Sequence, residues 1–429
     1  MSFRTKAPLL AATALVSAFG LQGTAHANAF YLEEQSARGA GRAFSGEGAD
    51  TGPDSLWWNP AAIAGIEESE ATIAASAVLP KGDVVDTGTV IRRPGQSFVP
   101  ITGNRTARDP INKGVVPTGA FAFRLNDRVA IGLAVTSPFS FTTDYDDDSW
   151  TRYSADKTKL VTIDIQPSIG VVVTDWLRVG GALNVEYTDA TLSNALPNIL
   201  ATQADGRQEL KGNGWDLGWT AGVQLHNDFA TVGISYKSSI QHTLKGDLNV
   251  TGLVGALAAG NESISGVKAR FNTPGQVIVA GRFRATQALT LNAQVVAYSW
   301  DKFDTIDLGA PVNLQIPEGY RDSWSLAGGF DYAISPKATF RAGVKRAVTP
   351  TQDGQRDARV PDSNRWVYAA GGSYQLTPRI GIDAGVNYVD FADTTIDRAT
   401  IAAGSTILTS GRLENASAVV LSLGGRVKF

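Results

Sequence analysis

Candidate catalytic residues are few once the first 27 positions are set aside. Two histidines remain, His226 and His242, and the chain has no cysteine. A histidine beside a serine would suit an esterase or lipase, but no G-x-S-x-G motif is present, nor an H-E-x-x-H motif or a P-loop. The lack of cysteine excludes thiol nucleophiles, disulfide frameworks and cysteine-bound metals. These residues predict a protein that is not an enzyme.

An aspartate cluster is the strongest candidate for a metal site, but Ser149 stands where an EF-hand loop has its turn glycine. Ala155 likewise stands where that loop has its terminal glutamate. We interpret the cluster as a solvated loop and leave cation binding open. Two Gly-x-Gly pairs, at 39–41 and 46–48, follow no predicted strand, so neither a dinucleotide site nor any other cofactor is expected. The cluster comprises Asp144, Asp146, Asp147 and Asp148.

The first 27 residues have the form of a secretory signal peptide. Arg4 and Lys6 precede a mostly apolar stretch over 9–21, and Ala25-His26-Ala27 is an A-x-A cleavage site. The alternative, a short buried helix, fits this order of features less well. Export without a lipidated cysteine indicates the periplasm or the outer membrane of a Gram-negative bacterium.

The composition of the 429 residues limits the class of protein further. Only 18% are charged, and the formal charge of −3 gives no basic surface for nucleic acid. Beyond residue 25, no stretch approaches the roughly 18 consecutive apolar residues of a membrane-spanning helix. The 43% of apolar residues instead alternate with polar ones, which is the period of a β-strand. One example is Leu177, Val179, Leu183, Val185 and Tyr187.

About fourteen such alternating runs follow one another along the chain. Short turns between them alternate with long polar connections, for example 81–114, 142–158 and 243–266. Even strand number, short turns at one end and long loops at the other describe a transmembrane β-barrel. The sheet must close because every backbone group needs a partner within a bilayer. The runs lie near 71–80, 115–125, 128–141, 159–174, 176–190, 210–227, 229–242, 275–285, 288–302, 321–333, 338–349, 364–376, 379–395 and 412–429.

Tryptophans near strand ends suggest the aromatic girdles of such a barrel. A soluble β-sandwich or propeller is the alternative, but neither requires short and long connections to alternate. The final residue, Phe429, closes an alternating strand, as an outer-membrane insertion signal would. The tryptophans assigned to the girdles are Trp150, Trp176, Trp215, Trp219, Trp300, Trp324 and Trp366.

Residues 28–69 do not alternate, and we expect them to form a plug in the barrel lumen. The segment is rich in glycine and carries apolar residues that are unsuited to a solvated periplasmic tail, which is the alternative interpretation. A wide barrel without a plug would enclose an aqueous channel. The apolar residues are Phe30, Tyr31, Leu32, Phe44, Trp57 and Trp58. The predicted domains are therefore a signal peptide (1–27), a hatch (28–69) and a barrel (70–429).

Several motifs of the mature chain resemble the FadL family of outer-membrane transporters. The most specific are the stretch from Arg42 to Ala49 and the tripeptide Asn59-Pro60-Ala61. Further matches spread over the whole mature chain. They include Trp150-Thr151-Arg152-Tyr153, Lys211-Gly212-Asn213-Gly214-Trp215, Ser235-Tyr236-Lys237-Ser238, Tyr298-Ser299-Trp300 and Val360-Pro361-Asp362-Ser363-Asn364-Arg365-Trp366.

The resemblance implies an all-β fold: a fourteen-stranded antiparallel transmembrane barrel with an N-terminal hatch in its lumen. It implies capture of a hydrophobic compound in an extracellular groove, then passage to a site near the mature N-terminus. Rearrangement of the hatch would open a route through the barrel wall, at a kink in the third strand. Lateral exit suits an apolar ligand, since hydrating each CH₂ in a water-filled pore would cost about 0.8 kcal/mol.

The resemblance also implies roles for individual residues. Phe30 occupies the position of an aromatic residue at the ligand site, and hatch packing is its alternative role. Arg321 lies where fatty-acid-binding members carry a cation for the carboxylate, although it could equally be a lumen or rim charge. Asn59, Pro60 and Ala61 match the tripeptide associated with gating, and would form an Asn-Pro turn in either case.

A proline in the third run suggests where the wall could open. Pro138, which follows Ser137, has no N–H to donate to a sheet ladder. Two interpretations stay open: Pro138 interrupts a strand, or the strand ends at Ser137. Pro167 also lies within a run, so proline alone does not locate an exit.

The substrate class stays open between long-chain fatty acids and uncharged aromatic or aliphatic hydrocarbons. Asp189 stands where the family has a second cation, which leaves room for hydrocarbons. Two other classes are a general diffusion porin, disfavoured by the apolar hatch, and an outer-membrane hydrolase that would need His226 or His242. We expect a monomer without nucleic acid that contacts outer-membrane lipid and lipopolysaccharide, and the barrel-assembly machinery during biogenesis.

Overall fold

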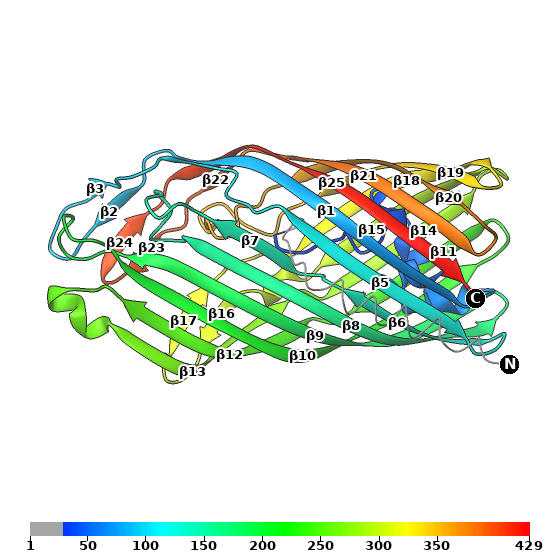
Figure 1. Ribbon diagram of the computed structural model, residues 1–429, viewed down its shortest axis with the longest axis horizontal. Helices are drawn as coiled ribbons and strands as arrows, with labels where there is room; N and C mark the ends of the chain where they lie inside the picture. The colour runs from blue at the N-terminus through cyan, green and yellow to red at the C-terminus, as the bar shows by residue number, and fades with distance from the viewer. Residues whose placement is uncertain (1–28) are drawn as a thin grey trace.

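A computed structural model describes residues 29–429 of the chain. The expected signal peptide, residues 1–27, lies outside the described residues. Fourteen wall strands form one closed antiparallel barrel, in agreement with the prediction (Figure 1). The wall comprises β1 (Glu70–Asp86), β5 (Gly114–Arg124), β6 (Val129–Thr136) with β7 (Ser140–Asp144), β8 (Lys157–Thr174), β9 (Leu177–Leu196), β10 (Gly206–His226), β11 (Ala230–Lys237) with β12 (Ile240–Thr251), β13 (Glu262–Thr273) with β14 (Gln276–Arg284), β15 (Leu289–Tyr298), β18 (Ser323–Ser335), β19 (Ala338–Ala347), β20 (Arg365–Gln375), β21 (Ile380–Phe391) and β25 (Gly411–Lys428).

The first and last strands close the barrel. β1 pairs with β25 from Glu70↔Lys428 to Asp86↔Gly411, with one bulge on the way. This ladder leaves neither terminal strand with an open edge, as a bilayer requires.

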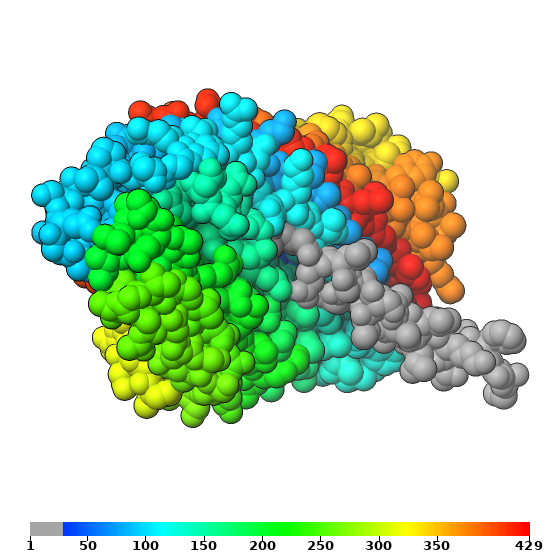
Figure 2. All heavy atoms as spheres, turned by 60° about the vertical axis from the view of Figure 1, so that its left-hand side comes forward, coloured from blue at the N-terminus to red at the C-terminus, as the bar shows by residue number. Residues whose placement is uncertain are grey.

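The two ends of the barrel differ. One end has tight turns, such as that between β8 and β9, and the other has long loops with structure of their own (Figure 1). Figure 2 brings the long-loop end forward, where the cyan loops after β1 and the green loops around β12 and β13 project beyond the wall. The loop elements are β2 (Val90–Arg92), β3 (Val99–Pro100), β4 (Thr106–Arg108), η4 (Gly255–Gly260), η5 (Trp300–Lys302), β16 (Thr305–Leu308), β17 (Leu314–Pro317), β22 (Thr394–Ile396), β23 (Thr400–Ala402) and β24 (Ser405–Leu408).

The alternating pattern separates an apolar outer face from a polar lumen. On β10, Leu217 is 71% exposed, while Gln224 on the same strand is fully buried. Successive side chains of a strand point to opposite faces, so one face meets lipid and the other meets the interior. Within residues 29–429, no helix is long and apolar enough to cross a membrane.

The expectation that most of the seven tryptophans belong to the girdles does not hold for two of them. Trp150 and Trp300 are buried, at 2% and 0% exposure, because both lie on segments that fold inward near the long loops. The remaining five expose their rings on the outside of the barrel: Trp176, Trp215, Trp219, Trp324 and Trp366.

The hatch lies inside the barrel, before β1 begins at Glu70. Figure 1 shows its short helices within the wall, in the half that holds the tight turns. Most of its residues are buried, including Trp57 and Trp58, as their apolar character predicts. The helices are α2 (Ala37–Ala40), η1 (Glu47–Ala49), η2 (Pro53–Ser55) and η3 (Pro60–Gly65).

Candidate functional site

The hydrogen-bond ladder between β5 and its neighbour β6 is interrupted along the wall. β5 pairs with β6 from Arg124↔Ala130 to Gly119↔Val135, and the same register returns only at the single bridge Ile111↔Thr143. Between these points, residues 114–118 of β5 pair with β1 but, within the described chain, with neither β6 nor β7. We call this unpaired stretch, residues 114–118 opposite 136–140, the ladder gap. Pro117 and Pro138 lie on its two sides, and neither can donate to a ladder.

The chain continues in the wall beyond Pro138. On the β8 side, β6 ends its pairing at Thr136↔Asp164, and β7 resumes it at Ser140↔Val161. Three residues, Ser137 to Phe139, thus lie opposite two of β8, which is the geometry of a bulge. Of the two interpretations of Pro138, the structure has an interrupted strand.

The N-terminal segment of the hatch, residues 29–36, supplies the missing partners of this bulge from inside. The Leu32 N–H donates to the Pro138 carbonyl (2.7 Å), and the Ser140 N–H donates to the Phe30 carbonyl (3.0 Å). Gln35 binds the backbone of Ser137 twice: its Nε2 donates to the carbonyl (3.0 Å), and its Oε1 accepts from the N–H (3.2 Å). The hatch therefore satisfies most of the interrupted strand where β5 does not reach it, and the Phe139 N–H donates to the Thr162 hydroxyl of β8 (2.9 Å).

Aromatic rings collect around Phe30, which is 2% exposed. Its ring centroid lies 4.9 Å from that of Trp300 and 5.1 Å from that of Phe303, both in edge-to-face contact. Phe139 and Phe141, from either side of Ser140, each lie 5.9 Å from Phe30. Tyr320 completes the group on the side of the long loops. We call these six residues the aromatic cluster: Phe30, Phe139, Phe141, Trp300, Phe303 and Tyr320.

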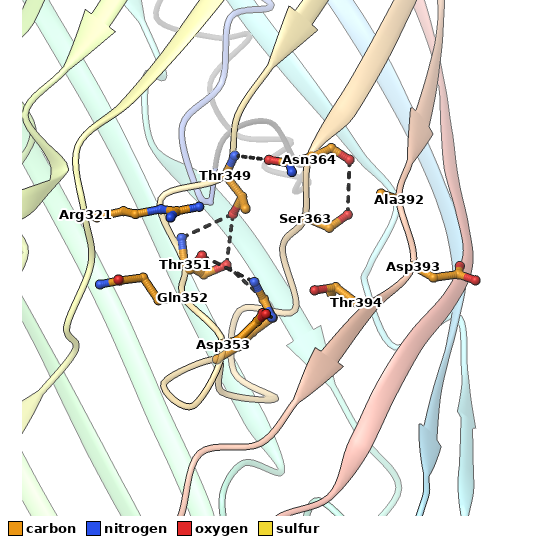
Figure 3. A pocket seen from close by; sticks show the side chains of 11 residues that line it. Arg321, Thr349, Thr351, Gln352, Asp353, Ser363, Asn364, Ala392, Asp393 and Thr394 are labelled. Atoms are coloured by element: carbon orange, nitrogen blue, oxygen red, sulfur yellow. Dashed lines mark hydrogen bonds and ion pairs between the residues drawn. The ribbon is translucent and has the colours of Figure 1, made fainter.

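Arg321 follows Tyr320 but lies in a different environment. It lines a polar cavity of about 420 Å³, and Figure 3 shows its side chain directed across that cavity towards Thr349 and Thr351. Its guanidinium forms no hydrogen bond or ion pair with any residue in 29–429, although its backbone N–H donates to Pro350. The polar cavity is lined by Arg321, Thr349, Thr351, Gln352, Asp353, Arg356, Ser363, Asn364, Ala392, Asp393 and Thr394.

The polar cavity and the aromatic cluster border each other. The chain passes from one to the other between Tyr320 and Arg321. Asp362 makes a second link, since its carboxylate accepts from the Ala29 N–H of the hatch (2.9 Å) and from the Thr349 hydroxyl (2.5 Å). A ligand with an apolar body and a polar end would find a matching environment for each.

The tripeptide Asn59-Pro60-Ala61 lies elsewhere, against the wall at β9 and β10. Asn59 caps η3 by accepting from the Ala61 N–H, and its amide donates to Gly48 (2.7 Å) and to Val223 of β10 (3.1 Å). The contact is close because Gly180 has no side chain: a Cβ there would lie 2.3 Å from the Ala61 nitrogen. The structure therefore does not bring this tripeptide together with Phe30 or Pro138.

Buried ion pairs hold the middle of the hatch to the wall. Arg42 contacts Glu47 and Asp50 of the hatch at 2.6 Å and Asp331 of β18 at 3.2 Å. Arg282 of β14 joins Asp50 and Asp331. Removing one partner of a buried pair typically costs about 3–5 kcal/mol, so these pairs anchor the middle of the hatch, as the buried pair of Glu33 with Lys345 anchors the N-terminal segment.

Two buried carboxyl groups outside the membrane-spanning strands have unusual acidity. Burial raises the pKa of Glu34, in the N-terminal segment, to about 7, although Arg365 lowers it. Burial also raises the pKa of Glu318 to about 7 against the opposing effect of Arg398, whose Nη1 lies 3.1 Å from its carboxylate. Both groups are therefore poised to change charge near neutral pH.

Other candidate residues lie outside these sites. Asp189 forms an ion pair with Lys159 (3.0 Å), and Asp144 of the aspartate cluster pairs with Lys157 (2.8 Å). Among the described residues, no group of three His, Asp or Glu side chains could hold a metal ion. His242 is buried inside the barrel rather than at the lipid face.

Sequence reasoning missed Gln35, Phe303 and the buried role of Trp300. The sequence shows Phe303 close to Ser299-Trp300. It does not show whether these rings point into the barrel or outwards, because both orientations occur at strand ends. Nothing in the sequence relates Gln35 to Ser137, because 102 residues separate them.

Known proteins resemble this chain over almost its full length. The long-chain fatty acid transport protein of Escherichia coli O6:H1 is 26% identical over 424 residues, which covers 90% of this chain and 91% of that protein. A Pseudomonas aeruginosa FadL homologue of known structure has a TM-score of 0.84 at 25% identity, with 94% of this chain and 100% of that chain covered. The toluene transporter TbuX of Ralstonia pickettii shares the fold, with a TM-score of 0.63 at 18% identity over 93% and 99% of the two chains.

The chain also matches a family described as "Outer membrane protein transport protein (OMPP1/FadL/TodX)" over residues 19–429. This match includes the hatch and all fourteen wall strands. An outer-membrane location agrees with the closed barrel and its apolar outer face. The chain therefore belongs to the OMPP1/FadL/TodX family of outer-membrane transport proteins.

Proposed function

We propose that this protein carries long-chain fatty acids or related lipophiles into the outer membrane by lateral diffusion through the barrel wall. The ladder gap carries this proposal: β5 and the interrupted strand share no hydrogen bonds there, and the N-terminal segment of the hatch lies against the gap from inside. An apolar ligand leaving sideways would enter the bilayer without crossing water.

The route begins at the long-loop end and leads to the aromatic cluster. Phe30 and Phe139 belong both to this cluster and to the segments that close the ladder gap. A ligand that displaces Phe30 would therefore also strain the hydrogen bond between the Phe30 carbonyl and Ser140. Binding and opening are coupled in this scheme because the same short segment makes both sets of contacts.

A fatty acid as substrate is supported by Arg321. Its guanidinium, which has no partner among residues 29–429, lines the polar cavity and would attract a carboxylate there, and the fatty acid transport protein of Escherichia coli is a relative. Uncharged aromatic hydrocarbons are the second candidate, supported by the ring-rich site and by the ion pair that neutralises Asp189. The hatch side chains that fill the lumen disfavour a general diffusion porin.

The tripeptide Asn59-Pro60-Ala61 has a supporting role in this scheme. It connects the hatch to β9 and β10 of the wall, so it would limit how far the hatch can shift. We assign it to gating on this basis rather than to ligand contact.

Uptake of labelled oleate and labelled toluene by cells with and without the protein tests the proposal. Faster uptake of either compound in cells that carry the protein is the expected result. Equal uptake of both compounds with and without the protein would refute transport. Fast permeation of hydrophilic sugars into liposomes that contain the protein would support a porin instead.

A further inference from the structure

A second, smaller cavity lies between the hatch and the interrupted strand. Pro138 and Phe139 of the ladder gap form one side, and Trp57 of the hatch forms another. Its accessible volume is about 10 Å³, room for about one water molecule. We call it the inner cavity. The wall contributes the polar lining residues Asp164, Glu186, Lys237 and Gln276.

The inner cavity concentrates buried polar atoms that lack partners. Three are donors: the Lys237 ammonium, the Gln276 amide and the Trp57 indole N–H. Two are acceptors: Oδ1 of Asp164 and Oε1 of Glu186. None of these five atoms has a hydrogen bond to any residue of the described chain. All five side chains are at least nine-tenths buried, and each unsatisfied group costs about 1–3 kcal/mol.

Lys237 is the central group of this cavity. Its ammonium lies 4.4 Å from the centroid of the Trp57 ring, a cation–π contact that satisfies no N–H. No carboxylate of the described residues lies within 4 Å of it, although Asp164 and Glu186 share the cavity. A lysine held this way has all three hydrogens available to an incoming acceptor.

The balance of charge restricts what could bind there. The ammonium of Lys237 shares the cavity with the carboxylates of Asp164 and Glu186. His242 lies next to Glu186, with its Nε2 3.6 Å from that carboxylate, and its Nδ1 lies 3.4 Å from Asp216. A further anion would meet a surplus of negative charge in a medium of low dielectric constant. A hydrocarbon would leave every one of these polar atoms unsatisfied.

A protonated carboxylic acid fits both requirements. Its carbonyl oxygen accepts from Lys237 or Gln276, and its O–H donates to Asp164 or Glu186. A carboxylate attracted by Arg321 takes up a proton from the water of the polar cavity before it moves inward, so no proton donor within the protein is needed. A neutral head group is also the form that enters a hydrocarbon layer at lowest cost.

We propose that the inner cavity is a transit site for the protonated head group of a fatty acid as it passes from the aromatic cluster to the ladder gap. This proposal rests on the lateral route proposed above, and it assigns the substrate class. The cavity enlarges when the N-terminal segment leaves, because Tyr31 of that segment contacts its wall. The Tyr31 ring lies 5.8 Å from Trp57 and 5.7 Å from Phe139.

Uptake of oleate compared with toluene tests this assignment in Lys237→Met cells. We expect oleate uptake to fall about tenfold or more, since a charge-assisted hydrogen bond is lost, while toluene uptake stays unchanged. Gln276→Leu, which removes a second donor without removing a charge, should have the same selectivity with a smaller effect. Lys268→Met on β13, an exposed lysine, is the control that should change neither compound. Equal amounts of each variant in the outer membrane are required.

Each other outcome has a separate meaning. An equal fall for oleate and toluene would mean that Lys237 only supports the structure, and no change for either would mean that the cavity holds water only. If the unaltered protein takes up toluene but not oleate, the proposal of a transit site is refuted, whereas the proposal of lateral transport is not. Uptake of neither compound would refute the transport proposal itself.

The protonation state of the head group can be measured directly. The ¹³C carboxyl resonance of carboxyl-labelled oleate bound to the purified protein at pH 7 should show two signals: a carboxylate signal from ligand beside Arg321, and a second signal at the chemical shift of the acid, which Lys237→Met should abolish. A carboxylate shift for all of the bound ligand would overturn the proposal of a neutral head group.

Discussion

The two hydrogen bonds between Gln35 and Ser137 give the sharpest test of how the ladder gap is held closed. Gln35→Ala removes both bonds and leaves the Ser137 N–H and carbonyl without a partner in a site where Ser137 is only 8% exposed. Each bond contributes about 0.5–1.5 kcal/mol, so the closed state should lose about 2 kcal/mol relative to an open one. This corresponds to an increase of about 30-fold in the open population.

The rate of labelling of a single cysteine can measure that population. Because the chain has no cysteine, Ser140→Cys provides one reactive thiol, at a position that is 3% exposed in the closed barrel. A maleimide should modify this thiol about 30-fold faster when Gln35→Ala is added, provided that opening precedes labelling.

A matched glutamine gives the control for this experiment. Gln96→Ala, in the loop after β2, removes an exposed hydrogen bond to the Ile199 carbonyl (2.8 Å) and should leave the labelling rate unchanged. Equal labelling rates with and without Gln35→Ala, within twofold, would refute the idea that Gln35 holds the N-terminal segment in place. Faster labelling with both variants would indicate a general loosening of the barrel.

Three further predictions concern the hatch. Asn59→Ala removes the cap of η3 and the bond to Val223, so uptake of the transported compound should fall several-fold at unchanged barrel abundance, measured by immunoblot of outer membranes. Gly180→Ala should lower the unfolding temperature in detergent, since its Cβ would lie 2.3 Å from the Ala61 nitrogen. Gly181→Ala is the control and should leave the unfolding temperature unchanged, because no atom lies within 4 Å of its Cβ. Equal effects of the two variants would contradict the close packing at Gly180. Glu34→Gln should raise the unfolding temperature at pH 8 and not at pH 4. Because burial raises the pKa of Glu34 from 4.5 to about 7, its ionised form destabilises the fold by about 3 kcal/mol above pH 7 and by nothing below pH 4.5. An equal change in unfolding temperature at pH 8 and pH 4 would disprove this.

Strand content and barrel closure were predictable from local pattern. The alternation along β10 and β25, for instance, depends only on neighbours in the chain, because side chains two residues apart share a face. The bilayer then leaves a closed sheet as the sole way to pair every backbone group. The apolar side chains of residues 28–69 likewise required burial, and the lumen was the place available for them.

The direction in which an aromatic residue points was not predictable in the same way. Trp300 and Trp324 both lie near strand ends, yet the first is fully buried and the second is 46% exposed. The difference arises because the chain turns inward at η5 after β15, so Trp300 meets Phe30 from the hatch. That contact joins residues 270 positions apart, beyond the reach of any local pattern.

The sequence by itself determined the exported barrel, its hatch and the membrane-facing residues, because periodicity and hydrophobicity are properties of neighbouring residues. Only the tertiary structure decided that Pro138 interrupts a strand instead of ending it, and that Gln35 binds the backbone that is left unpaired there. It alone gathered Lys237, Glu186 and Trp57 around one cavity from two wall strands and the hatch. The physical reason is that hydrogen bonds and charges act over a few ångströms in space, whatever their separation along the chain.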